Sequence, residues 1–151
     1  MGYNNSDNKT CVYLVDDDSE DQELFSDALS EVEIPTRLTV FNGCEALLRE
    51  LQTSRTLPDV IFLDLYMPGM SGEECVQNIR QVKAVDRTPV VIYSTSYHPE
   101  QVAHLFDLGA NRYLQKPISF QELISSITSA IASSVKHGVN AAPVYDLVEL
   151  S

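Results

Sequence analysis

Two kinds of hydrophobic pattern alternate along this chain. Three short, continuous apolar runs rich in β-branched and aromatic residues occur at 11–15, 60–63 and 90–93. Such runs, bounded by polar or turn residues, predict strands that are buried on both faces of a parallel sheet. A mixed run at 37–41 predicts an edge strand, and 112–114 is a short fifth candidate. We therefore expect five strands.

Helical patterns lie between these runs. Apolar residues recur at three- and four-residue spacing over 24–32 and again over 123–131, which predicts two amphipathic helices. Three further helices are expected at 44–52, 71–82 and 99–108. Pro99 at the start of the last one and Gly109 after its end are typical of a first turn and a C-cap. Strands that alternate with helices predict right-handed βαβ units and a doubly wound parallel α/β sheet with helices on both faces.

Length, charge and hydropathy exclude several classes of protein. The 151 residues suit one domain with a real core. No apolar run approaches the roughly 20 residues of a membrane span, so we expect no membrane insertion. The formal net charge of −12 would repel a phosphate backbone at long range, so we expect no nucleic-acid partner.

The cysteines and the first residues bear on the cellular compartment. Cys11, Cys44 and Cys75 are odd in number and widely spaced, which favours buried small apolar residues in a reducing compartment over a disulfide framework or a zinc site. The N-terminus lacks the apolar core of a secretory signal, so we expect a cytoplasmic protein. Gly2 and Ser6 fit an N-terminal acylation pattern, but no basic second signal accompanies them, and a disordered polar leader over 1–8 is the favoured interpretation.

Polar side chains follow four of the five predicted strands. They are Asp16, Asp17 and Asp18 after the first strand, Asp64 after the third, Ser94 and Thr95 after the fourth, and Lys116 after the fifth. Ligands of such folds gather where the carboxyl ends of the strands meet, so we expect these groups to share one site. Two ionised carboxylates about 5 Å apart repel by roughly 3 kcal/mol at an effective dielectric of about 20, and a divalent cation relieves that repulsion. Ligands that are all oxygen favour Mg²⁺, which leaves room for phosphate oxygens.

The same edge offers the groups that phosphoryl transfer needs. A phosphoryl group in transfer spreads charge over three oxygens, and a cation and a hydrogen-bond donor beside them stabilise it. Lys116 and Ser94 are the candidates for these two roles. Asp64 is then the expected nucleophile, and the product is an acyl phosphate.

Four segments, in this order, carry a family resemblance: "LVDDD", "FLDLYMPGMSG", "PVVIYSTS" and "YLQKPIS". Over about residues 9–132 the chain resembles the receiver domain of two-component response regulators, above all its single-domain, chemotaxis-regulator-like members. The resemblance implies a flavodoxin-like fold with strand order 2-1-3-4-5 and a signalling phosphoprotein rather than an enzyme. It also implies three segments: the leader 1–8, a receiver domain 9–132 and a C-terminal tail 133–151.

The resemblance assigns roles at the acidic edge. It makes Asp64 the phosphoacceptor, with Lys116 as the phosphate-binding lysine. For Mg²⁺ it makes Asp17 a direct ligand, Asp16 a ligand through water, and the main-chain carbonyl of Tyr66 a further ligand. The side chain of Tyr66 would also lie near the path of a hydrolytic water.

The resemblance further assigns a conformational switch. Ser94 would supply the switch hydroxyl, and Tyr113 would be the switch aromatic that rotates inward after phosphorylation. The Lys116–Pro117 bond would be cis, since X-Pro bonds tolerate that isomer. Thr95 departs from the usual small residue beside the phosphoryl group. The Ser-Thr-Ser stretch is reminiscent of stand-alone receivers associated with phytochrome-like kinases.

Partners and alternatives follow from this interpretation. The expected phosphodonor is a sensor histidine kinase or a histidine phosphotransfer protein, and the output is a protein contact, since 133–151 is too short for a helix-turn-helix unit. That tail is either a frayed terminus or a segment that packs on a partner or on a second copy in a homodimer. One alternative is a haloacid-dehalogenase-type phosphohydrolase, which needs an aspartate where this chain has Tyr66. Another is a receiver-like module that binds without phosphorylation, for which the acidic cluster or the lysine would have decayed.

Overall fold

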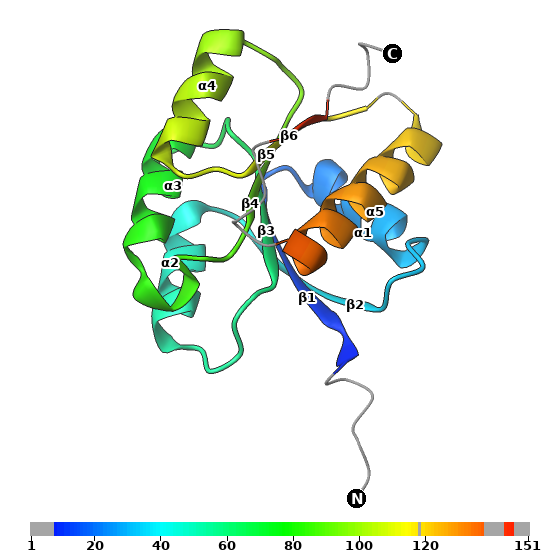
Figure 1. Cartoon of the computed structure of the whole chain (residues 1–151), viewed down its shortest axis with the longest axis horizontal. Helices are drawn as coiled ribbons and strands as arrows, with labels where there is room; N and C mark the ends of the chain where they lie inside the picture. The colour runs from blue at the N-terminus through cyan, green and yellow to red at the C-terminus, as the bar shows by residue number, and fades with distance from the viewer. Residues whose placement is uncertain (1–7, 118, 138–143, 147–151) are drawn as a thin grey trace, which may run out of the picture.

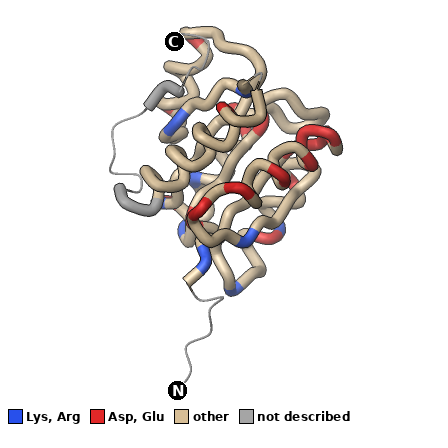
Figure 2. The backbone as a smooth tube through the Cα atoms, turned by 90° about the vertical axis from the view of Figure 1, so that its right-hand side faces the viewer, with Lys and Arg blue, Asp and Glu red and all other residues tan. Residues whose placement is uncertain are grey.

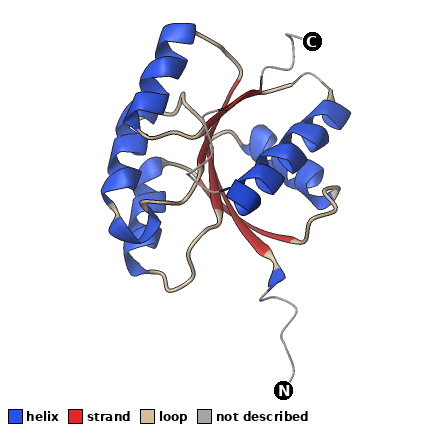
Figure 3. Cartoon of the chain, viewed as in Figure 1, coloured by secondary structure: helices blue, strands red, loops and turns tan. Residues whose placement is uncertain are grey.

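A parallel sheet lies between two layers of helices in the computed structural model, which describes residues 8–117, 119–137 and 144–146 (Figures 1 and 3). The strands are β1 (Thr10–Val15), β2 (Thr36–Phe41), β3 (Val60–Leu63), β4 (Val90–Ser94), β5 (Arg112–Gln115) and β6 (Val144–Asp146). Their order in the sheet is β2-β1-β3-β4-β5-β6, and every pair is parallel. The predicted flavodoxin-like order 2-1-3-4-5 is confirmed.

The helices divide between the two faces of the sheet. They are α1 (Ser19–Ser30), α2 (Cys44–Thr53), α3 (Gly72–Gln81), α4 (Pro99–Leu108) and α5 (Phe120–His137), with a 3₁₀ turn η2 (Lys83–Val85) after α3. α2, α3 and α4 cover one face, and α1 and α5 cover the other (Figure 1). Two hydrophobic cores result, one on each side of the sheet. The side chains of β1, β3, β4 and β5 are buried on both faces, whereas β2 at the edge is largely exposed. Within the described part of the chain, no helix is long and apolar enough to cross a membrane.

The C-terminal segment adds to the predicted sheet. α5 continues to His137, so residues 133–137 of the predicted tail belong to this helix. Residues 144–146 of the tail form β6, which pairs in parallel with β5 of the same chain. Neither of the two interpretations of the tail included this pairing, because a three-residue strand gives almost no periodicity. The expected leader, apart from Asn8, and the tail residues 138–143 and 147–151 lie outside the described residues.

Local capping fixes the start of α1, the start of α3 and the end of α4. Asp18 caps α1, as its side chain accepts hydrogen bonds from the backbone N–H groups of Glu20 and Asp21 at 2.8 and 3.2 Å. Ser71 and Glu74 form a capping box at the start of α3. Gly109 ends α4 with φ of 122°, a conformation that favours glycine, as predicted. The loops after β1 and β3 are therefore held at their helix ends.

Two predictions were wrong. Cys44 and Cys75 form a disulfide, although Cys11 is buried and free as expected. The two cysteines lie 31 residues apart, and only the packing of α2 beside α3 on one face of the sheet brings them together. The second wrong prediction is the cis Lys116–Pro117 bond. This bond is trans, and no cis peptide bond occurs among the described residues. The trans isomer is the ordinary one for X-Pro, favoured by about 0.5–1 kcal/mol.

One arginine joins two connections at the opposite edge of the sheet. The Arg80 guanidinium donates to the carbonyl oxygens of Val85 at 3.0 Å, Thr88 at 2.8 Å and Gly109 at 2.8 and 3.0 Å, and to Asn111 Oδ1 at 2.8 Å. Burial lowers the pKa of Arg80, and the charge of the nearby Asp86 opposes that shift. The side chain thus ties the end of α3 to the segments that lead into β4 and β5.

Candidate metal and phosphate site

Neighbouring strands bring the predicted carboxylates together. β1 and β3 pair with Val15 opposite Leu63, so Asp16 and Asp64 leave the sheet side by side. One carboxylate oxygen each from Asp16, Asp17 and Asp64 lies within 4.8 Å of the others. Asp16 is fully buried and Asp64 is 7% exposed, whereas Asp17 is exposed. The cluster is therefore buried at Asp16 and Asp64 and open to solvent at Asp17.

Lys116 completes the cluster from the end of β5. Its Nζ lies 3.3 Å from Asp16 Oδ2 and 3.8 Å from Asp64 Oδ1. Its shortest contact, 2.8 Å, is with Asp21 Oδ2 in the first turn of α1, a residue that was not among the predicted site residues. The ammonium group also lies 4.8 Å from the ring centroid of Tyr93. The lysine is thus held over the acidic cluster by contacts on several sides.

Burial and charge shift the protonation of these groups. Burial raises the pKa of Asp64 to about 6, and the negative charge of Asp16 adds to the rise, while Lys116 and a hydrogen bond from the backbone of Tyr66 oppose it. Burial also raises the pKa of Asp16. Burial alone would lower the pKa of Lys116, but its hydrogen bond to Asp21 and the nearby carboxylates outweigh that effect and raise it. The ionised cluster is therefore costly without further positive charge.

The donor set fits a hard divalent cation. The three side chains offer oxygen atoms only, and the exposed side at Asp17 leaves coordination positions open to water or phosphate. Acidic residues are also concentrated in α1, which begins next to this cluster, whereas the neighbouring helix α5 carries few charges (Figure 2). A cation bound at the cluster would neutralise part of the carboxylate charge.

The end of β4 carries a second, uncharged group of contacts. Ser94 is fully buried, and its Oγ accepts a hydrogen bond from the backbone N–H of Ser96 at 3.3 Å. The hydroxyl of Tyr113 donates to the carbonyl oxygen of Ser96. The Tyr113 ring is fully buried and packs edge-to-face against Tyr97 with centroids 6.0 Å apart. Tyr113 therefore lies in an inward position in this structure, and its rotation on phosphorylation stays a prediction.

Tyr66 links the loop after β3 to α4. Its side chain is 53% exposed, and its hydroxyl donates to Gln101 Oε1 and accepts from Ser96 Oγ, both at 3.2 Å. Gln101 Nε2 in turn donates to Glu73 Oε2 at 3.1 Å. Ser96, Gln101 and Glu73 have the appearance of ordinary surface residues in the sequence. Only the closeness of Ser96 to Ser94 in the chain could have pointed to one of them.

A parallel α/β sheet with three carboxylates and a lysine gathered at its carboxyl edge is a scaffold for handling a cation and phosphate together. The response regulator receiver domain family matches residues 12–128, and the chain belongs to this family. The family acts in signalling as a phosphoacceptor and not as a catalytic enzyme. The phosphohydrolase alternative is therefore wrong.

Known relatives agree with this assignment. The response regulator Rcp1 of Synechocystis sp. is 28% identical over 121 residues, which cover 77% of this chain and 82% of Rcp1. The Mn²⁺-bound structure of Rcp1 covers 82% of this chain and 92% of its own, with a TM-score of 0.70 and 28% identity. The phosphorylated cyanobacterial phytochrome response regulator RcpA covers 84% of this chain and 94% of its own, with a TM-score of 0.75 and 25% identity.

Other curated relatives are longer than this chain. The transcriptional regulatory protein HprR of Escherichia coli is 30% identical over 130 residues, which cover 86% of this chain. That match spans 54% of the length of HprR. The hybrid signal transduction histidine kinase D of Dictyostelium discoideum is 29% identical over 125 residues, and the match covers 83% of this chain and 8% of the kinase.

Proposed function

We propose that this chain is a response regulator that accepts a phosphoryl group on Asp64 in a Mg²⁺-dependent reaction. One observation carries the proposal: Asp64 lies in the cluster with Asp16 and Asp17, and its Oδ1 is 3.8 Å from Lys116 Nζ. A nearly buried carboxylate with clustered acidic neighbours and one facing ammonium group suits an acceptor whose added charge is met by a cation and a lysine.

The transfer itself is a displacement at phosphorus. An Asp64 carboxylate oxygen attacks the phosphorus of a phosphohistidine, an O–P bond forms and the P–N bond breaks. The electron pair stays on the imidazole, which leaves as a neutral group because its other ring nitrogen already carries a proton. Lys116 and the hydroxyl of Ser94 are the groups we assign to the transferred oxygens. Mg²⁺ would be held by Asp17, Asp64, the carbonyl of Tyr66 and, through water, Asp16, and it would supply charge neutralisation. Only the ionised form of Asp64 is a nucleophile.

Phosphorylation would be read out through Ser94 and Tyr113. If the Ser94 hydroxyl turns toward the phosphoryl group, it gives up its contact with Ser96. Ser96 also holds the Tyr113 hydroxyl and the Tyr66 hydroxyl, so a change there reaches β5 and α4 together. The surface of α4, β5 and α5 is then where a partner would detect the state.

The expected partners fit this role. A receiver domain implies a cognate histidine kinase. We propose a sensor histidine kinase or a histidine phosphotransfer protein as donor, and the likeness to RcpA makes a phytochrome-type kinase one candidate. We propose a protein as downstream target, with no nucleic-acid or membrane contact, and a homodimer as a further assembly of this chain. The net charge of −12 supports the absence of a nucleic-acid partner, because it would repel a phosphate backbone. We also propose that the chain acts in the cytoplasm.

Mass spectrometry after incubation with an acyl phosphate and Mg²⁺ tests the proposal. The parent chain should gain one phosphoryl group, and Asp64→Asn should gain none. Asp27→Asn, which changes an exposed carboxylate on α1, is the matched control and should react like the parent. A phosphoryl group that persists in Asp64→Asn would overturn the assignment of the acceptor.

A further inference from the structure

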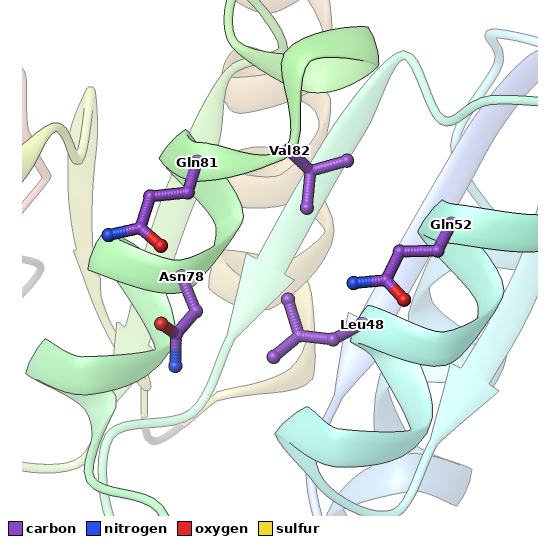
Figure 4. A pocket seen from close by; sticks show the side chains of 5 residues that line it. All are labelled: Leu48, Gln52, Asn78, Gln81 and Val82. Carbon is purple, nitrogen blue, oxygen red and sulfur yellow. The ribbon is translucent and has the colours of Figure 1, made fainter.

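The disulfide joins two helices that separate beyond it. Cys44 is the first residue of α2, and Cys75 lies near the start of α3. One or two turns further along, a hollow of about 420 Å³ opens between the helices. It is lined by Leu48, Gln52, Asn78, Gln81 and Val82, which Figure 4 shows between α2 and α3. The disulfide is thus a covalent tie at one end of a loosely packed interface.

The Cys44 side of the tie is bonded to the loop that carries Asp16. Asn42 lies two residues before Cys44, and its Oδ1 accepts a hydrogen bond from Gln22 Nε2 at 2.7 Å. The same Nε2 donates to the main-chain carbonyl of Asp16 at 2.6 Å. The backbone N–H of Asp16 also donates to the carbonyl of Phe41 at 3.0 Å. A displacement of the start of α2 therefore reaches Asp16 through short contacts.

The Cys75 side of the tie is packed against the residue next to Asp64. The backbone N–H of Cys75 donates to the carbonyl of Ser71 at 2.9 Å in the first turn of α3. Gly72 in that turn lies so close to Leu65 that a Cβ on Gly72 would be 2.5 Å from Leu65 Cδ2. Leu65 directly follows Asp64. The disulfide therefore lies between the two loops that hold the buried carboxylates.

We propose that Cys44 and Cys75 form a reversible redox site that controls cation binding and phosphoryl acceptance at the acidic cluster. The second half of this proposal rests on the function proposed above. Disulfides of cytosolic proteins are usually transient and redox-sensing rather than structural, so a disulfide in the expected compartment suits a regulatory role. Reduction would release α2 from α3 and loosen the spacing between the Asp16 and Asp64 loops.

A dithiol alone is a sufficient reductant for the exchange reaction. Its thiolate attacks one sulfur of the disulfide, the other sulfur leaves and takes a proton, and a second exchange yields two protein thiols and the cyclic disulfide of the reductant. Cys44 and Cys75 are 3% and 0% exposed, so the reagent must reach them through local opening. The start of α2 favours this, because Gly43 provides no side-chain cap, and a helix N-terminus stabilises a thiolate.

The test compares oxidised and dithiol-reduced protein. Alkylation without reductant should label Cys11 alone in the unfolded oxidised chain, and all three cysteines after reduction. Reduced protein should bind Mn²⁺ at least about fivefold more weakly and accept a phosphoryl group from an acyl phosphate more slowly by a similar factor, the lower end of typical coupling between sites. Cys44→Ser should match the reduced parent both with and without the dithiol. Cys11→Ser keeps the pair and should retain the full difference.

The outcomes separate this proposal from the proposed function. Equal Mn²⁺ affinity and equal phosphorylation in the two redox states overturn the redox proposal and leave Asp64 as acceptor. A difference in Mn²⁺ affinity without any phosphorylation supports the redox site and contradicts the proposed function. Three alkylated cysteines in the sample without reductant would also overturn the redox proposal. The reduced parent needs no substitution, so a variant that fails to fold does not remove the test.

Discussion

Asp64→Asn should stabilise the metal-free protein, and the gain should grow with pH. The pKa of Asp64 rises from 3.8 to about 6 on folding, because burial penalises the ionised carboxylate. Between these two pH values the folded chain holds a proton that the unfolded chain has released. The folded state therefore loses stability as the pH rises through this window, and the loss is complete above it.

The shift of about two pKa units sets the magnitude. At 1.36 kcal/mol per unit, ionised Asp64 costs the folded state about 3 kcal/mol at pH 8. At pH 4 most of the carboxyl is protonated in the folded state and about half in the unfolded state, so the cost falls below about 1 kcal/mol. Asparagine is never charged and avoids the cost at both pH values. The gain from Asp64→Asn should therefore be about 2 kcal/mol larger at pH 8 than at pH 4.

Urea unfolding in the presence of a chelator measures both free energies. Asp27→Asn, on the exposed face of α1, is the control and should change the free energy of unfolding by less than about 0.5 kcal/mol at either pH. Mg²⁺ at about 100 times its dissociation constant should stabilise the parent by about 2.7 kcal/mol and so offset most of the cost at pH 8. A gain for Asp64→Asn that is the same at pH 4 and pH 8 would refute the reasoning.

Three further predictions concern single side chains. Asp17→Ala should weaken Mg²⁺ binding at the cluster, and unchanged affinity in titration calorimetry would contradict its role as a ligand. Tyr66→Ala should lose the phosphoryl group faster with Mg²⁺ in excess, because the Tyr66 hydroxyl is held by Ser96 and Gln101 and the ring can shield the acceptor; an equal or slower rate rules out a shield. Arg80→Met should lower the free energy of unfolding by about 3 kcal/mol, since charge-assisted bonds to several carbonyls are lost, and a urea midpoint close to the parent would disprove this.

Strand ends explain how much of the site could be predicted from sequence. Continuous apolar runs identified the central strands, and carboxyl ends of parallel strands meet by construction, so Asp16, Asp64 and Lys116 were placed together without any distance information. Asp21 was missed because an acid in the first turn of a helix already has an ordinary explanation in the helix dipole. Its contact with Lys116 spans 95 residues and depends on how α1 lies over the edge.

Contacts between helices could not be predicted in this way. Hydrophobic periodicity shows which side of a helix faces the sheet, but not which residue of the next helix it meets. The Cys44–Cys75 pair and the bonds of Arg80 to the segment between α4 and β5 both depend on that lateral placement. A three-residue strand such as β6 likewise gains its definition from the β5 edge rather than from its own pattern.

The contacts of Ser96 connect the two residues that we predict to form the switch, Ser94 and Tyr113. A ligand or modification shifts an equilibrium only by the difference in its interaction with the two states. Tyr113 is buried and its hydroxyl is bonded to the Ser96 carbonyl, so the rotation predicted for it would have to exchange that bond. The Ser94 hydroxyl likewise has a contact to exchange, from Ser96 to a phosphoryl oxygen. Because Ser96 also holds Tyr66, the loop around Ser96 is the point at which a change at Asp64 would be divided between α4 and β5.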